Sequence, residues 1–282
     1  MNDDLPTNGL DADLVTDDLL MPTGESWDDI EDETVDSAGV LDDWIVFPVI
    51  ALGVVIGTVF PVLLSQQLCL PVLSTLVIFP LFVWAVRTGR SRRAVTLTLF
   101  WAFCLAVAML ALGIVLSGQA EATVQGVVEY RSQFIRWMAD ATPVTAAPAQ
   151  DWLGQVRDLV IFAVASAITA GLGGLFLLAM AINIVSVNAA GLVNEATRPV
   201  QTLLFGWPVW SIARLVGSVL IAVALAEPLA SGRLQTDALR AWFHARRRLL
   251  LYGLIALVVA ALLQLLLSPV YRSVLEAGLG LR

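Results

Sequence analysis

The chain has 282 residues, of which 58% are hydrophobic and only 14% are charged, and its mean hydropathy is +0.82. Soluble proteins average about 45–50% apolar and about 25% charged residues, so these values exclude an ordinary soluble domain. Because one bilayer crossing needs about 20 apolar residues, we expect an all-α polytopic membrane bundle with about six transmembrane helices.

Residues 1–43 form an acidic tail. They hold 15 acidic residues and no basic one, so the tail has a charge of −15 and the rest of the chain +7. High charge with little apolar content predicts disorder. Trp27 and Ile30 lie one helical turn apart among the acids, a pattern typical of segments that fold onto a partner. Two interpretations stay open: a segment that binds a cytoplasmic partner through Trp27 and Ile30, or a merely solvated tail.

Residues 44–117 predict a first membrane segment of three helices. Its apolar runs are Trp44–Leu64, Leu68–Val86 and Ala94–Leu116, with four arginines in the link 87–93. In the first run, Gly53 and Gly57 have the four-residue spacing that lets membrane helices approach closely.

The longest connection covers residues 118–157. Within it, residues 124–139 alternate apolar and charged side chains at helical spacing, with Tyr130 and Trp137 suited to the headgroup region. We expect an amphipathic interfacial helix there, ended by the Pro/Ala-rich stretch 141–150.

Residues 158–282 predict a second membrane segment of three helices with a basic loop at 231–248. The runs are Leu159–Val187, Leu203–Ala230 and Leu249–Leu267. We interpret the first as a single tilted crossing with the sequence GLGG at its middle. The second exceeds one crossing in length, so its path through the membrane needs a separate argument.

Arginines normally concentrate on the cytoplasmic side. With six crossings and a cytoplasmic tail, seven arginines fall inside and eight outside, so this count leaves the orientation undecided. If residues 203–230 entered and left on one face, eleven would lie inside and five outside. A lipid-exposed loop of that kind would leave backbone groups unpaired. We therefore expect a tilted helix from about Ile212 to Ala230, after an interfacial segment with Trp207 and Trp210.

Ionisable groups at membrane depth are candidate functional residues, and the apolar runs contain two, Arg214 and Glu227. They lie 13 residues apart on one helix, or about 20 Å, and so do not pair directly. Glu227 suits either a coupling carboxylate or an interfacial position. Arg214 suits substrate binding, headgroup contact or pairing with another helix. Asn183, Asn188 and Gln264 are further intramembrane polar side chains, fit for interhelical hydrogen bonds or for a substrate site.

The sequence contains few residues that could perform catalysis or bind a cofactor. The chain has two cysteines in apolar runs, Cys69 and Cys104, and a single histidine, His244. We expect no metal, haem or iron–sulfur group, no nucleophilic triad, and hence no enzyme. Nucleic acid is not expected as a partner, because the one concentrated charge block repels phosphate.

The composition favours a multi-pass protein of the plasma membrane, in a prokaryotic cell, with the tail in the cytoplasm. Its function is expected to be that of an accessory or scaffold subunit of a membrane complex, in contact with the lipid bilayer and with other membrane proteins. The alternative is a small transporter or permease component, which would need several polar groups converging at mid-membrane.

Overall fold

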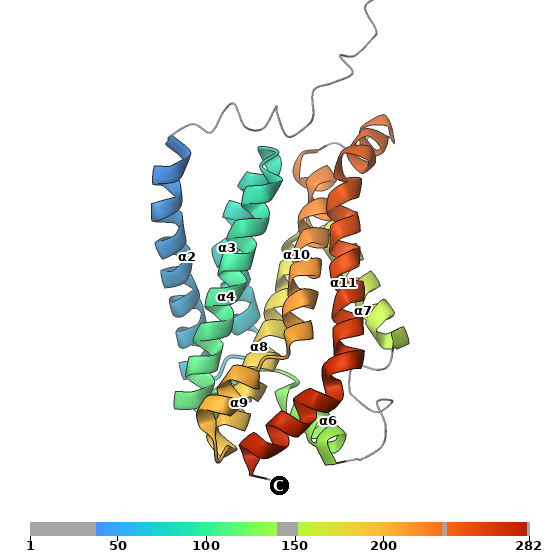
Figure 1. Ribbon diagram of the computed structural model, residues 1–282. Helices are drawn as coiled ribbons and strands as arrows, with labels where there is room; N and C mark the ends of the chain where they lie inside the picture. The colour runs from blue at the N-terminus through green and yellow to red at the C-terminus, as the bar shows by residue number, and fades with distance from the viewer. Residues whose placement is uncertain (1–37, 140–151, 233–235, 281–282) are drawn as a thin grey trace, which may run out of the picture. The chain divides into compact units, whose positions relative to one another are not determined.

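The computed structural model describes residues 38–139, 152–232 and 236–280, and the regular secondary structure within them is helical (Figure 1). The helices are α2 (Ala38–Leu63), α3 (Cys69–Arg87), α4 (Ser91–Val115), α5 (Ser117–Thr123), α6 (Val127–Ala139), α7 (Trp152–Ile168), α8 (Leu172–Glu195), α9 (Pro199–Phe205), α10 (Val209–Ala230) and α11 (Thr236–Leu279). The chain divides after residue 45, and the architecture below is that of residues 46–282. Residues 1–37 of the acidic tail lie outside the described residues, whereas its last residues, 38–43, form the first turns of α2.

Within the described residues, six helical segments are long and apolar enough to cross a membrane, which confirms the expected fold class. They are Trp44–Leu63, Cys69–Arg87, Ser91–Val115, Leu172–Glu195, Pro199–Ala230 and Trp242–Leu279. Large apolar side chains such as Leu52 and Phe60 on α2 and Leu254 and Leu262 on α11 are exposed, as lipid contact requires. The chain is therefore an integral, multi-pass membrane protein.

Hydrogen bonds between distant segments define the two ends of the bundle. At the first, the arginine-rich end, Arg87 Nε donates to the carbonyl oxygen of Ala230 at 2.8 Å, which joins the end of α3 to the end of α10. At the second, the amphipathic end, Gln67 Nε2 donates to the carbonyl oxygen of Ala122 at 2.9 Å, which joins the α2–α3 turn to α5. Helices α6 and α9 also lie at the amphipathic end (Figure 1).

The prediction of one crossing over Leu159–Val187 is wrong. This stretch contains parts of two helices, α7 and α8, which are joined by a tight turn. The turn includes two residues in the left-handed region, Ala170 at φ 52° and Gly171 at φ 93°. A Cβ at Gly173 would approach Ala165 to 3.0 Å. The glycines interpreted as the middle of one helix therefore allow two helices to turn and pack closely.

Helix α7 runs alongside α10 between the levels of Arg214 and Ala226. Near its start, Gln155 Oε1 accepts a hydrogen bond from Arg214 Nη2 at 3.4 Å. After its end, a Cβ added at Gly171 would lie 3.1 Å from Ala226. Arg214 and Ala226 are twelve residues apart on α10, which is about 18 Å of helix. Helix α7 thus returns the chain to the arginine-rich end before α8 crosses.

This return changes the relation between the two arginine-rich segments, 87–93 and 231–248. The sequence-based count had three crossings between them and therefore set them on opposite faces. Helix α7 adds a fourth traverse between them. The hydrogen bond from Arg87, in the first segment, to Ala230, just before the second, places both segments at the same end of the bundle. The tie in the arginine count came from the missing traverse.

The stretch 203–230 crosses as expected. Helix α9 ends at Phe205, a short turn contains Trp207, and α10 then runs unbroken from Val209 to Ala230. Pro208 is extended at ψ 137° and precedes the first helical residue, a place where its missing N–H is harmless. The continuous helix satisfies its backbone within itself, so the re-entrant alternative does not hold.

The predicted amphipathic helix is present as α6, but its apolar face contacts the protein's own chain. Phe134, Trp137 and Met138 are buried. The Trp137 ring lies 6.4 Å from that of Tyr271 on α11, and the Tyr271 ring lies 5.0 Å from that of Trp210 on α10. The expectation that Trp137 lies among headgroups is wrong, because α6 covers the ends of α10 and α11.

The glycine pair of α2 meets α3 at close range. A Cβ at Gly53 would come within 2.7 Å of Val77, and one at Gly57 would lie 3.5 Å from the backbone of Leu73. The four-residue spacing thus serves helix packing, as the sequence predicts.

Candidate functional site

Helix α8 is the most buried of the six candidate spans and carries the polar groups that stand out in the interior. Several buried hydroxyls elsewhere bond to their own helix, as Ser74 does to the carbonyl oxygen of Leu70 at 2.8 Å, whereas that of Thr202 on α9 has no partner within the described residues. On α8, the side-chain oxygens of Asn183, Ser186 and Asn188 have no hydrogen-bond partner within the described part of the chain. Buried polar atoms without a hydrogen-bond partner are uncommon in native proteins, so this helix is the candidate functional element.

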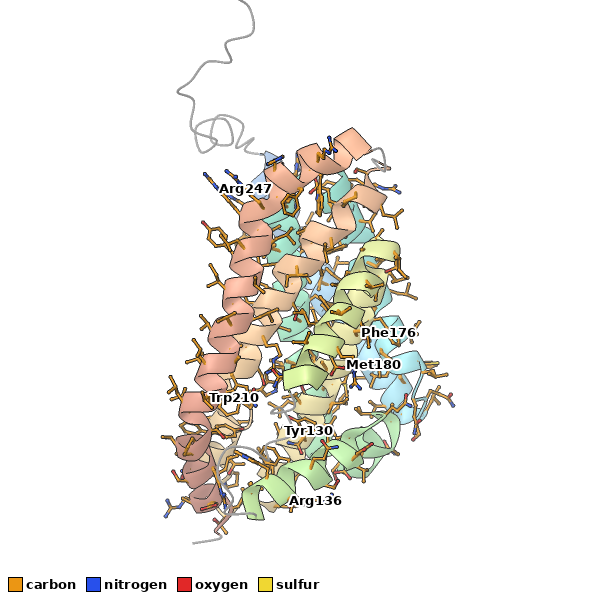
Figure 2. The ribbon with its side chains drawn as sticks, turned by 90° about the vertical axis from the view of Figure 1, so that its right-hand side faces the viewer. Tyr130, Arg136, Phe176, Met180, Trp210 and Arg247 are labelled. Atoms are coloured by element: carbon orange, nitrogen blue, oxygen red, sulfur yellow. The ribbon has the colours of Figure 1, made fainter. Side chains whose placement is uncertain are left out.

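Asn183 lines a cavity of about 240 Å³ near the amphipathic end. The cavity lies between the start of α3, the end of α5 and the middle of α8, where Phe176 and Met180 also border it (Figure 2). Its lining is Gln67, Leu68, Leu70, Pro71, Thr123, Val124, Gln125, Phe176, Met180 and Asn183. No charged side chain belongs to this lining. Asn188, five residues further along α8, is directed to another face of the helix.

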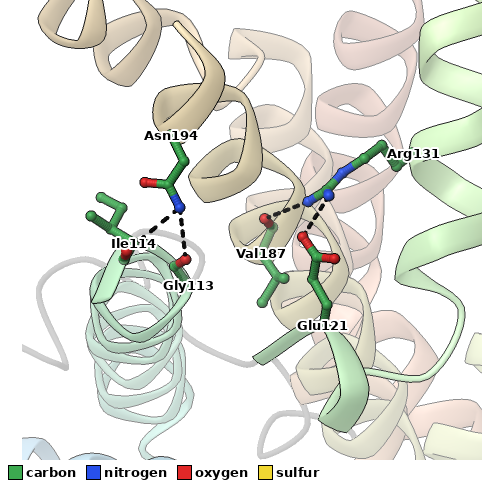
Figure 3. A network of polar contacts seen from close by, with 6 residues as sticks. All are labelled: Gly113, Ile114, Glu121, Arg131, Val187 and Asn194. Carbon is green, nitrogen blue, oxygen red and sulfur yellow. Dashed lines mark hydrogen bonds and ion pairs between the residues drawn. The ribbon is translucent and has the colours of Figure 1, made fainter. Parts of the chain in front are cut away.

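An ion pair lies against the second half of α8 (Figure 3). Arg131 Nη1 of α6 bonds to Glu121 Oε1 of α5, and Arg131 Nη2 donates to the carbonyl oxygen of Val187 at 3.5 Å. A Cβ at Gly191 would fall 2.0 Å from Arg131 Nη2. Only a glycine leaves room for this guanidinium on the surface of α8.

Asn194 binds the end of a neighbouring helix (Figure 3). Its Nδ2 donates to the carbonyl oxygens of Gly113 at 3.3 Å and Ile114 at 3.5 Å. The last carbonyls of a helix have no partner within it. The amide of Asn194 therefore caps α4 and holds it against α8.

A second polar cluster surrounds Arg214. Its Nη2 donates to Gln264 Oε1 of α11 at 2.9 Å and to Gln155 Oε1 of α7 at 3.4 Å. Burial raises the pKa of Tyr130 on α6, and the nearby Arg214 offsets part of that rise. The phenol of Tyr130 is thus neutral at physiological pH. Of the predicted alternatives for Arg214, pairing with other helices is the one that its contacts support.

Glu227 is separate from this cluster. Its carboxylate accepts two hydrogen bonds from Arg246 of α11, from Nε to Oε2 and from Nη2 to Oε1 at 3.1 Å. Such bidentate pairing fixes both position and orientation. Glu227 therefore ties α10 to α11 near the arginine-rich end.

The structure brings together some of the predicted residues and not others. Arg214 and Gln264 are in contact, while Trp27 and Ile30 lie outside the described residues.

Sequence reasoning missed the pairing of Glu121 with Arg131. The available signal was weak: Arg131 stands on the polar face of the amphipathic helix, which alone indicates solvent as readily as a partner. Over the described ranges, no group of three His, Cys, Asp or Glu side chains is placed to hold a metal ion.

No protein-family model, curated protein or solved structure matches the chain.

Proposed function

We propose that this protein is a non-catalytic accessory or scaffold subunit of a complex in the plasma membrane. The observation that carries the proposal is that the partly buried charged side chains are bonded to side chains of other helices. Glu227 pairs with Arg246, Glu121 pairs with Arg131, and Arg214 bonds to two glutamines. Each of these contacts joins one helix to another, which suits a rigid support better than a coupled carrier.

The arginine distribution supports a cytoplasmic position for the arginine-rich end. Segments 87–93 and 231–248 together hold nine of the sixteen arginines, whereas residues 118–157, residues 196–202 and the stretch after residue 270 hold six, and Arg214 lies within α10. The positive-inside bias then orients the start of α2, and with it the acidic tail, toward the cytoplasm. In this proposal the tail presents Trp27 and Ile30 to a cytoplasmic partner.

The test is the composition of the particle purified in mild detergent from the membranes of its source. We expect the full chain to co-purify with a second polypeptide at a fixed ratio, measured by native mass spectrometry. Chains that lack residues 1–43, or that carry W27A and I30A, should lose this polypeptide and keep the same melting temperature. A full-length chain that emerges alone, as a monomer or a homo-oligomer, would contradict the proposal.

A small transporter is the second candidate, and the cavity beside Asn183 favours it. A carrier must expose such a site alternately to both sides. In a C69S/C104S background, a cysteine at position 183 should react with a small thiol reagent added to the amphipathic side of proteoliposomes. Reaction from both sides would favour the carrier, and reaction from one side would favour the scaffold.

A further inference from the structure

We propose that Arg214 binds the phosphodiester group of an anionic phospholipid, whose headgroup lies at the amphipathic end beside α7, α10 and α11. This site is distinct from the tail-mediated binding proposed above and does not depend on it. Three features carry the proposal: a partly buried cation without a counter-charge, unused hydrogen-bond donors on that cation that reach the molecular surface, and apolar surface next to it on both flanking helices.

Arg214 differs in its partners from other partly buried arginines. Arg131 and Arg246 each pair with a carboxylate. Within the described residues, Arg214 bonds only to neutral amides, since its Nη2 donates to Gln264 Oε1 at 2.9 Å and to Gln155 Oε1 at 3.4 Å. A charge that is taken out of water is costly unless an opposite charge pairs with it. The surroundings of Arg214 therefore lack an anion.

The hydrogen bonds of Arg214 leave most of its guanidinium available. Arginine has five N–H donors, and the two amides occupy those of Nη2 alone. Within the described part of the chain, Nε and Nη1 have no hydrogen-bond partner, and neither atom is fully buried. The side chain as a whole is partly exposed. An oxyanion can therefore reach several donors of one planar group, which is the geometry that suits phosphate.

The position of Arg214 suits a lipid headgroup. It lies five residues after Val209, where α10 begins at the amphipathic end, which is about 8 Å along the helix. Helices α7 and α11 flank α10 (Figure 2) and, over the described residues, make little contact with each other. Val156 on α7 and Leu265 on α11, each next in sequence to one of the two glutamines, are 49% and 54% exposed. Because such apolar surface contacts lipid, the ligand is expected to be an amphiphile.

The charges around the site select an anionic headgroup. A phosphodiester with one negative charge neutralises the single positive charge of Arg214. Asp158, the acidic residue of α7, already pairs with Arg157. A zwitterionic headgroup would thus bring a cation to a place with no free carboxylate on α7 to receive it. Tyr130 of α6 lies within electrostatic range of Arg214, and its neutral phenol can donate a further hydrogen bond to a phosphate oxygen.

The experiment compares three lipids that share their acyl chains. Purified full-length protein in an uncharged detergent is titrated with dioleoyl phosphatidylglycerol, dioleoyl phosphatidylcholine and dioleoylglycerol, and bound lipid is measured by native mass spectrometry. We expect the phosphatidylglycerol to bind about ten-fold more tightly than either of the others, because it alone has a net negative charge for Arg214. Glycerophosphoglycerol, the same headgroup without acyl chains, should not displace it at about ten-fold excess.

Three variants locate the site. R214Q removes the cation and should abolish the preference for phosphatidylglycerol. R157Q removes an equal charge from an exposed arginine of α7 and should leave that preference unchanged. Q264E places a carboxylate where the amide oxygen now lies 2.9 Å from Arg214 Nη2. This internal counter-charge should also abolish the preference, at nearly constant side-chain volume. Q264E therefore decides the matter if R214Q fails to fold.

Equal binding of phosphatidylglycerol and either of the other lipids by the unchanged protein would overturn the proposal. So would an intact preference in R214Q or Q264E, or an equal loss in R157Q, which would indicate general attraction to a basic protein. Displacement by glycerophosphoglycerol would show that the site takes a water-soluble anion instead. Loss of the tail-bound polypeptide in the earlier experiment has no bearing on these outcomes, so the two proposals fail separately.

Discussion

The absence of a side chain at Gly191 makes the contact between α6 and α8 possible. We expect G191A to displace the Arg131 guanidinium, since the new Cβ would lie 2.0 Å from Nη2. Losing the bonds to Glu121 and Val187 should lower stability by about 1–2 kcal/mol. The measurement is the thermal unfolding midpoint in detergent.

Gly118 supplies the matched control, because a Cβ there would meet no atom within 4 Å. G118A should leave the midpoint unchanged or raise it slightly, since alanine favours helix. In an R131A background, G191A should have little further effect. A full additional loss in that background would show that Arg131 is not the reason for the glycine.

The pair formed by Glu227 and Arg246 permits a charge exchange. E227R and R246E each leave like charges facing one another in a partly buried place, and each should lower stability by about 2–3 kcal/mol. The double variant E227R/R246E restores an opposite pair and should recover most of that loss. A double-mutant cycle on the unfolding midpoints gives the coupling, and additive losses would contradict the pairing.

Single polar residues could be selected from the sequence, but their partners could not. Arg214, Glu227 and Gln264 stand out because charges and amides are rare in apolar runs. Which of them meet depends on how the helices are rotated about their axes, and a pattern of apolar residues on nearly every face does not specify that rotation. Arg214 and Gln264 therefore became neighbours only in the structure.

At the scale of elements, the turn between α7 and α8 decides the path of the chain. We expect G171A to lower stability by about 1–3 kcal/mol, because its φ is 93° and a Cβ would lie 2.4 Å from the ring of Phe82. Its neighbour gives the opposite test. Ala170 also has a positive φ, so A170G should leave stability unchanged or raise it. Unfolding midpoints of the two variants, compared side by side, check both signs.

The long apolar helices were predictable, and the break between α7 and α8 was not. The apolar run Leu159–Val187 contains no charged or proline residue to mark a turn. Glycine is also common inside membrane helices, so GLGG is ambiguous until the backbone conformation is known. By contrast, Gly206 and Pro208 interrupt the next run with residues that stop helices, and the start of α10 near them was foreseen within a few residues.

At the scale of the whole molecule, the topology predicts which loops share a side. In a C69S/C104S background, single cysteines at Thr88 and Ser231 should react with a membrane-impermeant thiol reagent from the same side. A cysteine at Ala196 should react from the opposite side. Labelling of right-side-out and inverted vesicles measures this, and opposite sides for Thr88 and Ser231 would show that α7 does not traverse.

The shortness of α7 has a consequence for how the protein is made. Its uncharged part, between Asp158 and the turn at Gly171, is only about half the length that a bilayer crossing needs. As the nascent chain emerges, α7 alone is too weak a signal for the insertion machinery to place it across the membrane. Helix α8 follows at once and is apolar from Leu172 to Ile182. We therefore expect the two to partition into lipid together as a hairpin, so that the orientation of every later helix is decided by a segment that is still inside the ribosome when α7 emerges.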